Sequence, residues 1–162
     1  MKKLVALTSA MLLLGVCGTA FAASSAAQTV TYQVSAINEI SVSGNPGALI
    51  VSAATAGSQP TAVTDATTTY AITTNGSAKR ITGVLNTVMG TGLSLKVTLT
   101  APSTGTSAGQ VTLTAGALSL VTAIGAVAES GIAISYEFSA TAAAGVVSSA
   151  TKTVTLTVAD AA

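Results

Sequence analysis

The sequence predicts an all-β fold, an antiparallel immunoglobulin-like β-sandwich of about eight or nine strands that follows an N-terminal signal peptide. Three observations indicate this class. Apolar and polar residues alternate with a period of two along most of the chain, clusters of Gly, Ser, Pro and Asn separate the alternating segments, and no later segment has the pattern of an amphipathic helix. Each predicted strand therefore has one face for a core and one for solvent.

The first 22 residues have the pattern of a secretory signal peptide. Met1, Lys2 and Lys3 form a basic start, Leu4 to Val16 is an apolar run, and Ala20-Phe21-Ala22 is a small-x-small site. We expect cleavage between Ala22 and Ala23, so that 1–22 is the leader and 23–162 is a single β-sandwich domain. The protein is then exported to the periplasm, the cell surface or the extracellular space.

Cys17 offers a second interpretation of the leader. Leu14-Gly15-Val16-Cys17 is similar to a bacterial lipoprotein signal, in which the cysteine is lipidated, but Val16 fits poorly where a small residue is expected. The apolar run is also shorter than the roughly 20 residues that span a bilayer. We expect ordinary cleavage, with lipid anchoring through Cys17 as the alternative.

The first predicted strand of the exported chain is Thr29 to Ile37. Its apolar residues alternate with polar ones, as Val30, Tyr32, Val34 and Ala36 against Thr31, Gln33 and Ser35. Further along, Tyr70 and Ile72 alternate with threonines, and Asn75-Gly76 precedes Arg80 to Leu85, which predicts a β-hairpin with a tight turn at Asn75-Gly76.

Four later segments have the clearest strand patterns. Three of them, 93–99, 132–138 and 154–158, have apolar residues at every second position, and the fourth, 118–124, is an apolar stretch. The same alternation places all four aromatic residues of the exported chain in the core, namely Tyr32, Tyr70, Tyr136 and Phe138. So few aromatics, all assigned to packing, predict no small-molecule pocket.

Composition excludes several function classes. Only 7% of residues are charged, and after Ala22 four basic residues stand against five acidic ones, which predicts neither nucleic-acid binding nor peripheral membrane binding. The chain has no His, and no Cys after Cys17, so it lacks a Ser-His-Asp triad, a thiolate nucleophile and a Cys/His zinc site. We expect no enzyme activity, no cofactor and no metal, with the five carboxylates on the surface: Glu39, Asp65, Glu129, Glu137 and Asp160.

The segment Thr29 to Ile37 lacks the features that protect sheet edges. Natural edge strands use charges or Pro to prevent pairing with other chains, and this segment contains neither. It could therefore add to the sheet of a neighbouring molecule. The alternative is that it completes the sandwich of its own chain.

A basic-start leader followed by a Cys-free, Thr/Ala/Val-rich chain whose first strand reads Thr29-Val30-Thr31-Tyr32-Gln33-Val34 resembles small exported bacterial surface and matrix proteins. TasA-type fibre subunits and WxL-like domains are examples, although the chain has no Trp and so lacks the WxL signature. The resemblance to TasA-type subunits implies polymerisation by donation of an N-terminal strand to the next subunit. The candidate assembly strand consists of Thr29, Val30, Thr31, Tyr32, Gln33, Val34, Ser35, Ala36 and Ile37.

Two functions remain open from the sequence. The first is a non-catalytic structural protein that assembles with itself or with another surface protein into an envelope, matrix or fibre structure. The second is a monomeric extracellular binding or adhesion module that uses the loops 101–110 and 142–150, because loops on a rigid sandwich commonly mediate recognition.

Overall fold

A computed structural model describes residues 25–161. The predicted leader, Cys17 and the predicted cleavage site between Ala22 and Ala23 lie outside the described residues. The chain divides into two units, the first ending at Gln33 and the second starting at Val34. Of the first unit the structure describes residues 25–33, which contain no strand and are exposed throughout.

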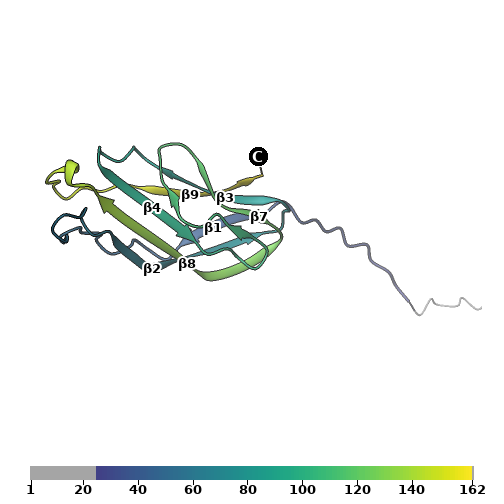
Figure 1. Ribbon diagram of the computed structural model, residues 1–162. Coiled ribbons are helices and arrows are strands. Elements are labelled where there is room, and N and C mark those ends of the chain that lie inside the picture. Colours follow the sequence, from purple (N-terminus) through teal and green to yellow (C-terminus); the bar gives the residue numbers. More distant parts are fainter. Residues whose placement is uncertain (1–24, 162) are drawn as a thin grey trace, which may run out of the picture. The chain divides into compact units, whose positions relative to one another are not determined.

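From Val34 onward the chain forms two antiparallel sheets, which confirms the predicted all-β class (Figure 1). One sheet has the order β1-β2-β8-β4-β6 and the other β5-β7-β3-β9. Within residues 25–161 there is no α-helix, and hence no helix that could cross a membrane. The elements are β1 (Asn38–Val42), β2 (Val63–Thr74), β3 (Lys79–Leu85), β4 (Leu93–Leu99), β5 (Thr106–Ser107), β6 (Val111–Thr112), β7 (Leu118–Ile124), β8 (Val127–Ala140), the 3₁₀ turn η1 (Ala142–Ala144) and β9 (Val154–Asp160).

Period-two alternation accounts for most of these strands. The predicted strands at 93–99 and 118–124 are β4 and β7 with the same bounds, and those at 132–138 and 154–158 lie inside β8 and β9. In β4, Leu95, Val97 and Leu99 are buried while the residues between them are half-buried. The β-branched and aliphatic side chains thus pack on one face of the pleated strand.

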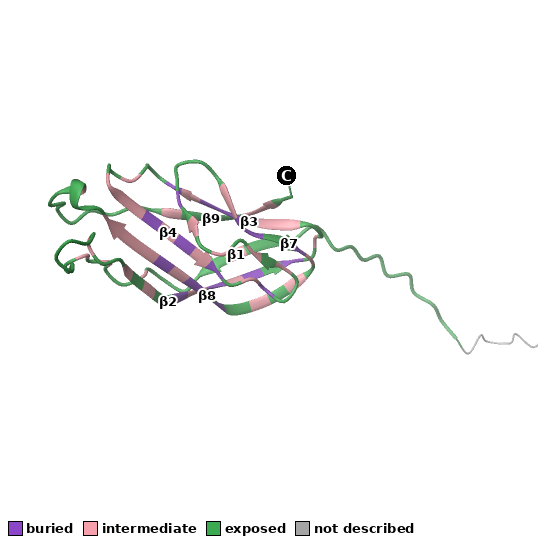
Figure 2. Cartoon of the chain, in the orientation of Figure 1, coloured by how far each residue is buried: buried purple, intermediate pink, exposed green. Residues whose placement is uncertain are grey.

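Both sheets contribute to one core, seen as the purple bands on the central strands in Figure 2. Tyr70 and Tyr136 are buried in it and Phe138 packs against it, as predicted from their positions. The buried members are Tyr70, Ile72, Ile81, Leu85, Leu95, Val97, Leu99, Leu113, Leu120, Val121, Ile124, Ile132, Ile134 and Tyr136.

Tyr70 also has a polar role at the margin of this core. Its hydroxyl donates to the Thr100 carbonyl oxygen at 2.6 Å. Burial, with a smaller effect of the Glu129 charge, raises the pKa of Tyr70 to about 12. The hydroxyl therefore remains a protonated donor that ties β2 to the end of β4.

The predicted hairpin at Asn75-Gly76 is wrong. β2 pairs with β1 and β8, whereas β3 pairs with β7 and β9, so the two strands belong to different sheets. The Asn75-Gly76 connection crosses from one sheet to the other. Local turn chemistry does not distinguish this crossing from a tight hairpin, because both need a short polar connection between two alternating segments.

Candidate functional site

The segment Thr29–Ile37 forms no strand in the structure, and the first strand begins only at Asn38. Tyr32 is 90% exposed, and Val30 and Val34 are each 76% exposed. The assignment of Tyr32 to the core is therefore wrong. Alternation predicts burial only for a residue whose segment is paired within a sheet. Within residues 25–161 no strand pairs with this segment, so its apolar side chains remain exposed.

The C-terminal end of this segment is held by Asn75. The Asn75 Oδ1 accepts from the Ile37 N–H at 2.9 Å, and its Nδ2 donates to the Ser35 carbonyl at 2.8 Å. The Asn75 N–H also donates to the Ile37 carbonyl at 3.3 Å. Asn75 thus fixes the backbone just before β1.

The two sheets have four edges, and these differ in length. The edges at β5 and β6 are two residues each, and they belong to neighbouring pieces of chain joined by residues 108–110. The edges at β1 and β9 have five and seven residues, and these two strands approach each other on the other side of the domain. Short edge strands are one way in which proteins limit edge pairing, so the side with β1 and β9 is the more open one.

β9 pairs with β3 on one side and with no strand on its other side, although β1 of the other sheet lies close to it. The Asn86 N–H donates to the Thr153 carbonyl, and the Ala161 N–H donates to the Ala78 carbonyl. Together with the register, these two bonds show which alternate residues of β9 form backbone hydrogen bonds with β3. Because bonding direction alternates along an antiparallel strand, Val154, Leu156 and Val158 direct their N–H and C=O groups away from β3. In the part of the chain that the structure describes, no strand pairs with these groups.

β9 also lacks the usual protection of an edge strand. It contains no Lys, no Pro and no register shift over its seven pairs with β3. Its one charged residue, Asp160, lies at the end and pairs with Lys79. Sequence reasoning missed this edge, although the uncharged run Val154–Ala159 has the same signal that singled out Thr29–Ile37.

The inner side of this open edge is incompletely covered. Val154, Leu156 and Val158 pack against the core but are only half-buried, and β9 is pink and green without purple in Figure 2. Ile81 and Leu85 of the neighbouring β3 are 0% and 1% exposed. Water therefore reaches apolar side chains along β9 that an additional strand could cover.

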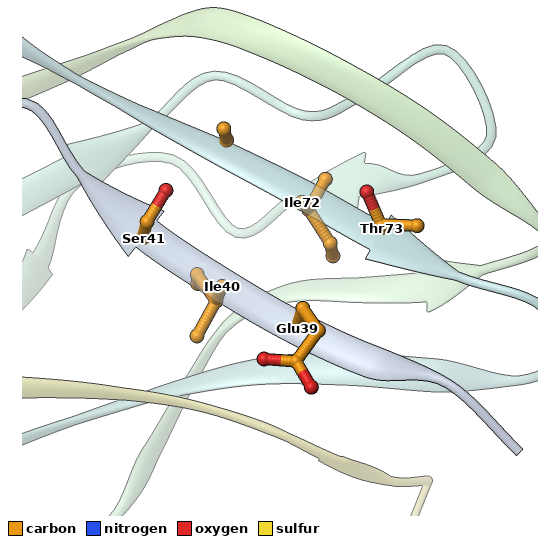
Figure 3. A pocket seen from close by; sticks show the side chains of 6 residues that line it. Glu39, Ile40, Ser41, Ile72 and Thr73 are labelled. Atoms are coloured by element: carbon orange, nitrogen blue, oxygen red, sulfur yellow. The ribbon is translucent and has the colours of Figure 1, made fainter.

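A shallow hollow of about 140 Å³ lies nearby, along β1 and β2. In Figure 3, Ile40 of β1 lies beside Ile72 of β2, its partner in the ladder, and Glu39 lies next to them. Ile40 is half-buried, as are the inner residues of β9. The hollow is small and shallow, and we assign it to the margin of the core rather than to a ligand.

Four of the five carboxylates predicted to lie on the surface accept hydrogen bonds, and the fifth, Glu39, is exposed in β1. Asp65 accepts from the N–H and hydroxyl of Thr67 and from the Gly47 N–H, and Glu129 accepts from Ser103. No group of three His, Cys, Asp or Glu side chains gathers within residues 25–161. These contacts order loops and strand ends.

Glu137 belongs to a polar cluster on β4 and β8. Lys96 Nζ lies 2.9 Å from Glu137 Oε1, and Gln110 Nε2 donates to Glu137 Oε2 at 3.0 Å. These bonds, chiefly that from Lys96, hold the pKa of Glu137 below its usual value. The cluster is partly exposed, with Lys96 and Glu137 side chains 32% and 26% accessible.

This cluster predicts a specific acid sensitivity. Because the folded-state pKa of Glu137 is lowered, its contribution to stability is present at neutral pH and is lost as the pH falls through the folded pKa. We expect Lys96→Met to lower the melting temperature at pH 7 and to reduce its loss between about pH 5 and pH 3. Melting curves at several pH values measure both effects.

Lys152→Met is the matched control for this experiment. The Lys152 ammonium donates to Thr87 and to the Val88 carbonyl, and to no carboxylate among the described residues. The Lys152→Met substitution removes the same charge, but it leaves no carboxylate without its ion-pair partner. An acid-induced loss that is equally steep in both variants would contradict the assigned role of Lys96.

The two loops of the alternative binding function lie at opposite ends of β8. Loop 101–110 contacts the start of β8, where the Ser103 N–H donates to Glu129 at 3.1 Å. Loop 142–150 follows the end of β8, and the Ala142 N–H donates to Gln59 at 2.7 Å. At roughly 3.3 Å per residue these ends are about 40 Å apart. A binding site would therefore use one loop or the other.

No protein-family model matches the chain, and no curated protein and no solved structure matches it.

Proposed function

We propose that this protein is a non-catalytic structural protein, exported to the cell surface or matrix, that assembles with itself by donating Thr29–Ile37 to a neighbouring copy. One observation supports this most strongly. Thr29–Ile37 has the alternation of a half-buried strand, yet its apolar side chains at Val30, Tyr32 and Val34 are exposed. A strand of this kind gains its hydrophobic and backbone partners when it joins another sheet.

We infer that the two antiparallel sheets form an immunoglobulin-like sandwich, since the strands cross repeatedly from one sheet to the other around a shared core. The predicted leader supports export, and the resemblance to TasA-type fibre subunits suggests how the copies are joined. Low charge also favours association, because like-charge repulsion between copies is weak.

The test is whether the purified exported chain assembles. We expect regular fibres or discrete oligomers by negative-stain microscopy, and elution ahead of the monomer in size-exclusion chromatography, with the assembled fraction rising with protein concentration. A strictly monomeric species across the concentration series contradicts self-assembly.

The second candidate is a monomeric adhesion module, and one observation favours it. Val146 and Val147 lie in the loop 142–150 with exposures of 104% and 53%, so this loop presents apolar surface to solvent. Exposed apolar groups on a loop can contact a partner protein. A monomer whose binding to another surface protein is lost on Val146→Ser and Val147→Ser substitution would support this function instead.

A further inference from the structure

We propose that the free edge of β9 is the surface that accepts Thr29–Ile37 of a second copy of this chain. This inference rests on the proposed function and names the partner surface within it. Among the edges in residues 25–161, β9 is the longest, with seven residues, and it is paired on one side only. At about 3.3 Å per residue it offers a ladder of about 23 Å.

The side-chain patterns of the two segments match over this length. β9 directs Val154, Leu156 and Val158 toward the core and Thr155 and Thr157 toward solvent. With Tyr32 placed opposite Leu156, the donated segment sets Val30 and Val34 beside the other two half-buried residues. Its polar residues Thr31, Gln33 and Ser35 then lie on the same outer face as the threonines of β9.

The backbone groups match as well. Val154, Leu156 and Val158 direct N–H and C=O groups outward, and a strand with Tyr32 opposite Leu156 supplies the complementary groups. Neither partner introduces a charge, because Thr29–Ile37 and Val154–Ala159 contain none. The apolar margin of the core is then covered without burying an unpaired charge.

The donor comes from a second copy rather than from the same chain. Ser35 and Ile37 are held by Asn75, beside the end of the domain at which β9 finishes opposite Lys79. To lie along its own β9, the segment would have to reverse direction immediately before these residues. Thr29–Ile37 contains no Gly or Pro with which to make such a tight turn.

Disulfide crosslinking between copies tests this assignment. In the antiparallel arrangement, which both sheets use throughout, Gln33 of the donor lies opposite Thr155 in a non-hydrogen-bonded pair. Such pairs have Cα atoms about 4.5 Å apart, which a disulfide can span. We therefore expect the exported chain 23–162 with Gln33→Cys and Thr155→Cys, which has no other cysteine, to form multimers without reductant and to lose them with reductant.

The control places the second thiol on the short edge strand β6, on the side of the domain away from β9. Thr112→Cys in β6 makes the same substitution at an exposed threonine of an edge strand. Mass spectrometry of the linked peptides identifies which residues are joined, and melting curves verify that each variant is folded. A link from Gln33→Cys to Thr155→Cys, or to Thr157→Cys for a parallel donor, supports the proposal.

Two outcomes separate the acceptor edge from the proposed function. Fibres that link Gln33→Cys to Thr112→Cys, or to Ser41→Cys in β1, and not to β9 overturn the β9 assignment while leaving self-assembly intact. A chain without substitutions that remains monomeric overturns the proposed function itself.

Discussion

We expect a chain that lacks Ser25–Gln33 to keep the free energy of unfolding of the complete chain and to form no fibres or oligomers. The removed residues are exposed and belong to no strand, so their loss removes no buried apolar surface from the domain. Val34–Ile37 remain, which preserves the hydrogen bonds of Asn75 to Ser35 and Ile37. Denaturant titration measures the stability, and negative-stain microscopy measures the assembly.

A pair of single substitutions refines this prediction. Val34→Lys places a charge on the face of the segment that would meet the acceptor core, and we expect it to abolish assembly, because burying an unpaired ammonium is costly. Gln33→Lys adds the same charge to the opposite face, and we expect assembly to persist. A deletion that unfolds the chain would instead show that the segment completes its own domain, and a deleted chain that still assembles would exclude it as the donor.

The second large effect concerns Gly83 in the middle of β3. A β-branched residue normally has a higher strand propensity than Gly. Local propensity alone therefore predicts that Gly83→Val stabilises the protein. The structure predicts the opposite, because a Cβ at this position would lie 2.6 Å from Leu120 Cδ1 and 3.2 Å from Leu113 Cδ2. Both leucines are buried, so we expect a loss of about 1–3 kcal/mol in the free energy of unfolding.

Two further variants verify the cause. Ala133→Val introduces a valine at an exposed position of β8, and we expect little change or a small gain in stability. Leu120→Ala combined with Gly83→Val should lower the free energy of unfolding by less than the sum of the two single effects, since the smaller side chain makes room for the larger one. Additive losses, or a stable Gly83→Val variant, would contradict the close packing at Gly83.

The strands that sequence reasoning predicted best lie in the interior of the sheets. β4 and β7 have the predicted bounds, β4 because its burial alternates along the strand and β7 because it is an apolar stretch. The same alternation in Thr29–Ile37 led to a wrong assignment for Tyr32. Alternation reports that a segment suits a sheet, and it does not report whether that sheet is in the same molecule.

Of the two parts of the candidate site, only the donated segment Thr29–Ile37 could be predicted from the sequence, and the acceptor strand β9 could not. Missing charge and missing Pro are visible in the sequence of Thr29–Ile37. The same signal is present in β9, but its meaning depends on whether β9 is an edge or a central strand. Strand order is set by pairings between residues far apart in the chain, such as Lys79 with Asp160, and no local pattern encodes them.

The sequence by itself determined the all-β class, the position of the main strands and the scarcity of groups for catalysis, because each of these depends on composition and on residues close together in the chain. Only the tertiary structure decided that Asn75-Gly76 crosses between sheets, that Gly83 packs closely against Leu120 and Leu113, and that β9 is an edge strand. These features depend on which strands become neighbours, and that follows from burying a shared core as a whole.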